Sequence, residues 1–256
     1  MSSETSGHVT GSAKMKYGAP IAWIAILAAL GTVLRFVPLY FWAEGGGYTA
    51  VSVIIEYLNG LILGPIGGAI CGLVYGIIGL FVLPAAIPWV TVLHPVIVAF
   101  TTGMLANKKW WAAWPICAVF VALQQLVPYY WPGPPTYPAA PQPKYFLASF
   151  WLWVPLILMP ILGPRLIPEW LRSDDKKKLF IALVLALWIA TEPVWGGWWF
   201  AWNWAFNLPP GLCMSVFLTM YWYEKALGWG STAVIGTALF SALRRSGLRK
   251  IPGAIW

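Results

Sequence analysis

The chain has 256 residues, of which 60% are hydrophobic and only 9% are charged, whereas about a quarter of the residues in a soluble domain are charged. This composition excludes an ordinary soluble protein and indicates that lipid is the solvent. Apolar stretches near the length of about 20 residues that crosses a hydrocarbon core recur from Pro20 almost to the C-terminus. They lack the two-residue alternation of a β-barrel wall. We therefore predict an all-α, polytopic transmembrane bundle in the cell membrane.

The net charge of +8 reflects where the Lys and Arg residues lie. If the N-terminal tail with Lys14 and Lys16 is cytoplasmic and successive connections alternate sides, the basic segments 108–109, 165–178 and 225–250 all fall inside. This is the positive-inside pattern of membrane proteins. It predicts that both ends are cytoplasmic, and it assigns the positive charge to the lipid bilayer and not to nucleic acid.

The apolar stretches predict about eight spans, each close to the length that crosses a membrane. The predicted spans are residues 20–42, 49–64, 66–86, 88–106, 110–130, 145–164, 178–195 and 204–223. The short second span ends at Gly64-Pro65, because proline supplies no backbone N–H and lets the chain turn. The proline-rich segment from Trp131 to Lys144 predicts an irregular external loop.

The segment after the last predicted span is apolar at residues 231–243, but it is short for a crossing. Another crossing would also carry Arg244 and Arg245 to the outside. We therefore predict a C-terminal amphipathic helix that lies on the inner membrane surface. The predicted organisation is a polar cytoplasmic tail (1–19), a transmembrane domain (20–226) and a basic, amphipathic cytoplasmic tail (227–256).

Ionisable side chains inside spans are costly, so each is a candidate functional group. Arg35 lies about seven residues before the outer end of the first span, and Glu56 about seven residues after the outer start of the second, so both lie roughly 10 Å below the outer surface. We predict that they pair. The pair serves either a ligand or only the packing of the two helices.

Other spans place polar groups at the same depth, and the segment Trp195–Trp204 adds a run of aromatic residues. The aromatic run offers stacking and cation–π surfaces for a flat or cationic ring, or it belongs to the interfacial aromatic belt. Near the outer face we predict a solute-binding site. Its predicted residues are Arg35, Glu44, Tyr48, Glu56, His94, Gln124, Gln125, Tyr129, Glu192, Trp195, Trp198 and Asn203.

Catalytic and metal chemistry has few candidate residues in this chain. There are two His residues, and Cys71, Cys117 and Cys213 are far apart in the sequence. No metal cluster, nucleophile–base pair or Gly-rich phosphate loop emerges from these residues. We expect neither an enzyme nor a bound metal or cofactor.

The segment from Tyr48 to Leu83 carries a family resemblance. It reads Glu56-Tyr-Leu-Asn-Gly60-Leu-Ile-Leu-Gly-Pro65, followed by Ile-Gly-Gly-Ala-Ile-Cys-Gly72. It resembles the second and third helices of the substrate-binding S components of energy-coupling factor (ECF) transporters, and the Ala-rich first span is similar too. The resemblance covers roughly residues 20–106.

The resemblance implies a function and partners. It implies that a small-residue face of the first span, with Ala22, Ala25 and Ala29, docks on a transmembrane coupling subunit, and that a pair of ATPases drives import. It also implies that a small organic solute, a vitamin or a precursor, binds near the outer face under the loop from Trp42 to Tyr48. The sequence lacks the N-terminal His-rich ligand set of the metal-transporting branch. The alternatives are a non-catalytic accessory subunit of a larger membrane complex and, less favoured, a membrane enzyme.

The predicted topology can be tested by cysteine labelling. In a chain without its native cysteines, Ser173→Cys and Ser246→Cys should react with an impermeant thiol reagent only from the cytoplasmic side. Thr136→Cys should react only from the outside, because basic connections are retained inside. The measurement is labelling in right-side-out and inverted vesicles. Labelling of Ser173→Cys from outside would contradict the predicted orientation.

Overall fold

The computed structural model describes residues 21–41, 48–82, 88–125, 150–206, 221–248 and 251–256. This part of the chain is almost wholly helical, which confirms the all-α prediction. The helices are α1 (Ile21–Leu34), α2 (Ser52–Ile62), α3 (Gly64–Val82), α4 (Pro88–Ala106), α5 (Trp110–Gln125), α7 (Phe150–Leu162), α8 (Leu166–Leu171), α9 (Lys176–Phe206) and α11 (Tyr221–Arg245). Two short antiparallel strands, β1 (Pro38–Phe41) and β2 (Tyr48–Ala50), follow α1.

Four of the described helices are long and apolar enough to cross a membrane. These segments are Gly64–Val82, Trp89–Ala106, Lys176–Trp198 and Trp222–Arg245. Large apolar side chains point outward from several helices: Ile26 is 63% exposed, Phe81 86% and Val234 61%. Lipid, and not water, is the solvent that suits such a surface. These features are those of a membrane protein, whereas eight crossings stay a prediction.

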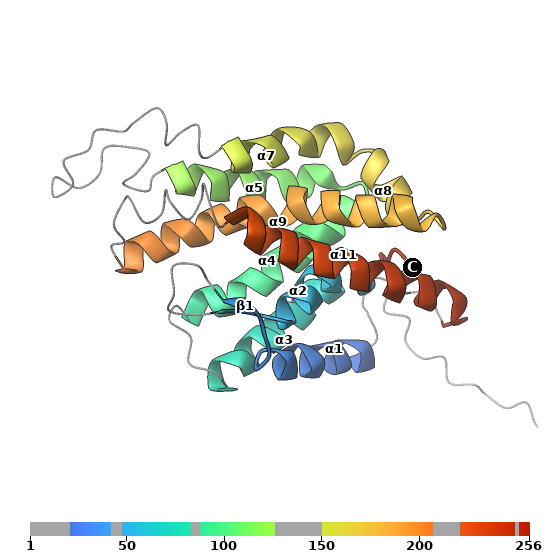
Figure 1. Ribbon diagram of the computed structural model, residues 1–256, viewed down its shortest axis with the longest axis horizontal. Helices are drawn as coiled ribbons and strands as arrows, with labels where there is room; N and C mark the ends of the chain where they lie inside the picture. The colour runs from blue at the N-terminus through green and yellow to red at the C-terminus, as the bar shows by residue number, and fades with distance from the viewer. Residues whose placement is uncertain (1–20, 42–47, 83–87, 126–149, 207–220, 249–250) are drawn as a thin grey trace, which may run out of the picture.

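Two helices form the centre of the bundle, and the others pack around them (Figure 1). Every residue of α2 is buried, and this helix packs against α1, α3, α4 and α11. Helix α9 packs against α4, α5, α7, α8 and α11. Helices α4 and α11 therefore contact both central helices and join the two halves of the bundle.

Glycines let α3 approach α2 and α4 closely. A Cβ atom at Gly68 would lie 2.7 Å from the Cα of Gly60 in α2, and one at Gly72 would lie 2.6 Å from the carbonyl oxygen of Pro95 in α4. A larger residue at either position would push the backbones apart. The four-residue glycine spacing of this helix therefore serves packing within the chain.

The first predicted span is longer than the observed helix. The predicted segment 20–42 includes β1, because α1 already ends at Leu34 and Pro38–Phe41 pairs with β2. The fourth predicted span, 88–106, matches α4 at both ends. Hydropathy cannot separate an apolar strand from the end of an apolar helix, which explains the first error.

The structure differs from the prediction of a separate C-terminal interfacial helix. Residues 231–243 do not form a separate interfacial helix: they belong to α11, a single helix that packs on α9 and α2, and the predicted domain boundary at residue 226 falls inside it. The hydroxyl groups of Ser231 and Thr232 donate to the carbonyl oxygens of Leu227 and Gly228 within the helix. These polar residues are thereby satisfied without leaving it. Of the predicted span 204–223, residues 207–220 lie outside the described part.

Residues Ile251–Trp256, here called the C-terminal strap, fold back onto the end of α2. The N–H of Ile255 donates to the carbonyl oxygen of Leu61 at 3.1 Å, and the indole of Trp256 donates to that of Ile62 at 3.0 Å. Pro65 has no N–H to offer a carbonyl of the preceding turn. The strap therefore supplies donors to two carbonyl oxygens at the end of α2, and Ile251, Ala254, Ile255 and Trp256 are buried.

The strap should contribute strongly to stability. Trp256→Ala should lower the free energy of unfolding by about 3 kcal/mol, because it removes a buried ring that packs on Trp23 and a hydrogen bond to α2. Trp256→Phe, which keeps a ring, should lose about 1 kcal/mol. Thermal unfolding in detergent measures both, with the 64% exposed Trp111→Ala as control. Equal unfolding temperatures for Trp256→Ala and the unmodified chain would contradict the role of the strap.

Candidate functional site

Glu56 of α2 lies at the centre of a buried polar cluster. The hydroxyl of Tyr75 in α3 donates to Glu56 Oε1, and Nδ1 of His94 in α4 lies 3.0 Å from Glu56 Oε2. All three residues are nearly inaccessible to solvent. The cluster thus joins three helices through one carboxylate, and each carboxylate oxygen has a partner.

Arg35 joins this cluster through Tyr75. Its guanidinium carbon lies 4.0 Å from the centre of the Tyr75 ring, a cation–π distance. Gly79 provides the room, because a Cβ atom there would collide with the guanidinium. The predicted ion pair between Arg35 and Glu56 is wrong: both side chains are described and they do not pair. Tyr75, which was not among the predicted site residues, contacts both of them.

Aromatic residues of α9 cover the other side of His94. The ring centre of His94 lies 4.5 Å from that of Trp195 and 5.5 Å from that of Trp198. Trp198 follows Trp195 by three positions, so the two tryptophans share one face of α9. Trp198 is only 1% exposed and also contacts the rings of Trp89 and Phe120. The alternative of an interfacial belt does not hold for Trp198, because its ring is internal, whereas Trp195 is only partly buried.

A second buried charged pair lies beside Trp195. Glu192 of α9 and Lys225 of α11 approach to 3.4 Å, and the Lys225 ammonium lies 4.4 Å from the centre of the Trp195 ring. The indole N–H of Trp195 donates to the hydroxyl of Tyr57 in α2 at 3.0 Å. Trp195 therefore connects the two charged clusters. Lys225 was predicted to belong to a basic cytoplasmic connection, but it is buried near the start of α11 and paired with Glu192.

Several buried polar atoms have no hydrogen-bond partner within the described part of the chain. They include Nε2 of His94, Oε1 of Gln124 and both side-chain polar atoms of Asn59. Asn59 follows Glu56 by three residues, which places it on the same face of α2. An orphaned buried polar atom is unfavourable, so these atoms are candidates to bind a solute or water.

The remaining predicted site residues fall into two groups. Gln125 lies at the end of α5, and Tyr48 donates its hydroxyl to the backbone carbonyl of Arg35. Glu44, Tyr129 and the side chain of Asn203 lie outside the described residues. Cys71 and Cys117 are buried free thiols, and the described residues contain no group of three or more potential metal ligands.

The predicted docking residues lie on one open face of α1. Ala22, Ala25 and Ala29 are all exposed, whereas Leu27 and Ala28 on the opposite face are buried. The alanine stripe is therefore not used for packing within the described part of the chain. It leaves a smooth apolar surface of the kind that permits close helix approach.

No protein-family model, no curated protein and no solved structure matches the chain. The geometry of its own residues therefore carries the functional argument. That geometry is a buried, aromatic-lined polar cluster inside a helical membrane protein, formed by residues of α2, α3, α4 and α9 together with Arg35 and the start of α11. The resemblance to ECF S components stays a prediction.

The Glu192–Lys225 pair gives a direct test of the site's electrostatics. Glu192→Gln or Lys225→Met should each lower the free energy of unfolding by about 3 kcal/mol, because each leaves one buried charge unpaired. The double variant should lose clearly less than the sum of the two. Thermal unfolding of all four proteins in detergent gives the coupling. Strictly additive losses would show that the two charges do not interact.

Proposed function

We propose that the chain is the membrane-embedded solute-binding subunit of an ECF-type importer, and that a small organic solute binds beside Glu56, His94 and Trp195. One observation carries the proposal: separate helices bring buried charged groups, unpartnered polar atoms and aromatic rings to one place. Small-molecule sites commonly combine apolar walls with a few convergent polar groups.

The position of the cluster supports binding from the outer side. Glu56 and His94 lie in the first halves of α2 and α4, and Lys225 lies near the start of α11. The basic connections near Lys108, Arg172 and the end of α11 gather at the opposite end of the bundle (Figure 1). If basic connections face the cytoplasm, the cluster lies in the outer half.

The chemistry of the cluster favours a flat solute with hydrogen-bonding edges. Trp195 and Trp198 offer ring faces, and His94 Nε2 and Gln124 Oε1 offer a ring nitrogen and an amide oxygen. Stacking supplies affinity, while the polar atoms distinguish one solute from another, since a solute that leaves them unpaired binds poorly.

A coupling partner is part of the proposal. The sequence contains no Gly-rich phosphate loop, so the energy for import would come from other subunits. The open alanine stripe of α1 supports docking of a transmembrane coupling subunit at Ala22, Ala25 and Ala29.

One observation favours the alternative of a non-catalytic accessory subunit. Glu56 is bound by Tyr75 and His94, and Glu192 is paired with Lys225, so both carboxylates have partners within the chain. Internal pairs of this kind can serve packing alone. The two functions differ in whether the unpartnered atoms and ring faces receive a solute.

The test begins with mass spectrometry of small molecules that co-purify with the protein. The affinity of the identified solute is then measured in Trp198→Ala, Gln124→Ala and His94→Ala proteins that remain folded. Trp198→Ala should weaken binding by about 1 to 2 kcal/mol, because it removes a stacking face.

Trp111→Ala is the matched control, because this exposed tryptophan lies at the other end of the bundle, at the start of α5. Its affinity for the solute should equal that of the unmodified chain. Unchanged affinity in all three site variants would refute the proposed location. A purified chain with neither co-purifying solute nor any ligand-dependent stabilisation would favour the accessory subunit.

A further inference from the structure

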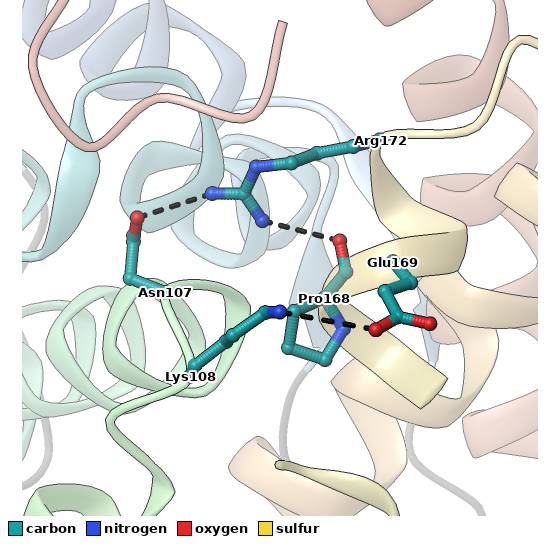
Figure 2. A pocket seen from close by; sticks show the side chains of 5 residues that line it. All are labelled: Asn107, Lys108, Pro168, Glu169 and Arg172. Carbon is teal, nitrogen blue, oxygen red and sulfur yellow. Dashed lines mark hydrogen bonds and ion pairs between the residues drawn. The ribbon is translucent and has the colours of Figure 1, made fainter. Parts of the chain in front are cut away.

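A separate pocket lies at the basic end of the bundle, between the end of α4 and α8. It has a volume of about 390 Å³ and is lined by Asn107, Lys108, Pro168, Glu169 and Arg172 (Figure 2). Asn107 follows His94 by 13 residues, which corresponds to about 20 Å along a helix axis. The pocket is therefore distinct from the polar cluster around Glu56.

Arg172 is held in place at the rim of this pocket. Its guanidinium donates to the carbonyl oxygens of Ala106 and Pro168 and to Oδ1 of Asn107 at 3.1 Å. A guanidinium has five N–H donors, so these three bonds leave donors for a ligand. Figure 2 shows the guanidinium between Asn107 and Pro168, with Lys108 beneath it.

Lys108 occupies a backbone position that normally favours glycine. Its φ is +62°, and the N–H of Lys109 bonds back to the carbonyl oxygen of Met104, as at the end of a helix with a Schellman cap. The backbone of a lysine is strained in this conformation relative to that of a glycine, which supports a functional role for the Lys108 side chain. Its ammonium lies 3.8 Å from Glu169, and both side chains are more than half exposed. Such an open contact is weak, and the ammonium can turn to another anion.

Basic residues outnumber acidic ones around the pocket, where Glu169 contacts Lys108 and Asp174 contacts Arg244. Arg172 and Lys108 line the pocket, Arg244 donates to the carbonyl oxygens of Leu171 and Ser173 at the end of α8, and Arg165 precedes α8. Burial, and next the neighbouring charge of Arg244, lower the pKa of Arg172 from its ordinary value. A bound anion would relieve this repulsion between cations.

We propose that this pocket binds the phosphate of a phospholipid headgroup from the inner leaflet, through the Lys108 ammonium and the free N–H groups of Arg172. A lipid is favoured over soluble phosphate because exposed apolar side chains lie close in sequence to the pocket residues. Trp111, Ile161 and Phe180 are 64%, 64% and 37% exposed and can contact acyl chains. Basic pockets at the cytoplasmic ends of membrane helices are known to take such headgroups.

A headgroup bound in this pocket would also affect the C-terminal strap, through Asn107. The Asn107 amide accepts from Arg172 through Oδ1 and donates to the carbonyl oxygen of Gly253 at 2.8 Å through Nδ2. A headgroup that orders Arg172 thereby supports the contact between Asn107 and the strap. Lipid binding should for this reason raise the unfolding temperature of the whole chain.

The test uses the full chain in a non-ionic detergent with added phosphatidylglycerol. Native mass spectrometry should show retained lipid, and the unfolding temperature should rise. Lys108→Gln should weaken retention about fivefold, the equivalent of about 1 kcal/mol for one lysine near a lipid phosphate. Lys109→Gln, which changes a neighbouring exposed lysine that does not line the pocket, should leave retention unchanged.

Three results would overturn the proposal. The first is that the unmodified chain retains no phosphatidylglycerol. The second is that Lys108→Gln and Lys109→Gln weaken retention equally, because the attraction would then belong to the basic surface and not to the pocket. The third is that inorganic phosphate at equal concentration protects as well as the lipid. None of these results depends on the solute site, which lies at the other end of α4.

Discussion

The close approach of α3 to α2 and α4 is the constraint on which the polar cluster depends. Gly68 and Gly72 bring backbones into contact that any side chain would separate. At this distance the Tyr75 hydroxyl reaches Glu56, and Gly60 likewise lets α2 pack directly on α4, where His94 meets the same carboxylate. In lipid, helix association relies on such packing and on buried polar contacts, because apolar surfaces gain little by leaving lipid tails for one another. Packing and polar chemistry are therefore coupled in this protein.

The depth of a residue along its helix could be predicted from the sequence, but the direction in which its side chain points could not. Counting residues from the span ends placed Glu56 and His94 at one depth, and the two side chains do meet, because the rise per residue is constant. Which side chain meets which depends on helix rotation and crossing, and a single sequence does not carry that information. For this reason Tyr75 was missed, and Arg35 was paired with Glu56 when it contacts the Tyr75 ring.

The C-terminal region shows a second limit of hydropathy. Small and hydroxyl-bearing residues such as Gly228 and Ser231 interrupt an apolar pattern, yet α11 continues through them because the hydroxyl bonds to the preceding turn. Because Pro65 has no N–H, it cannot donate to a carbonyl oxygen at the end of α2. Ile255 and Trp256, almost 200 residues away in the chain, donate to carbonyl oxygens there instead. No local rule predicts so distant a partner.

The central claim is that a solute occupies the cluster joined by Trp195. The most direct measurement is a density map of the purified chain with its co-purified solute, obtained by electron cryomicroscopy with a bound antibody fragment. The account predicts solute density within hydrogen-bonding distance of His94 Nε2 or Gln124 Oε1, against the ring of Trp195 or Trp198. Density confined to the basic end near Arg172, with the cluster closed as described, would contradict it.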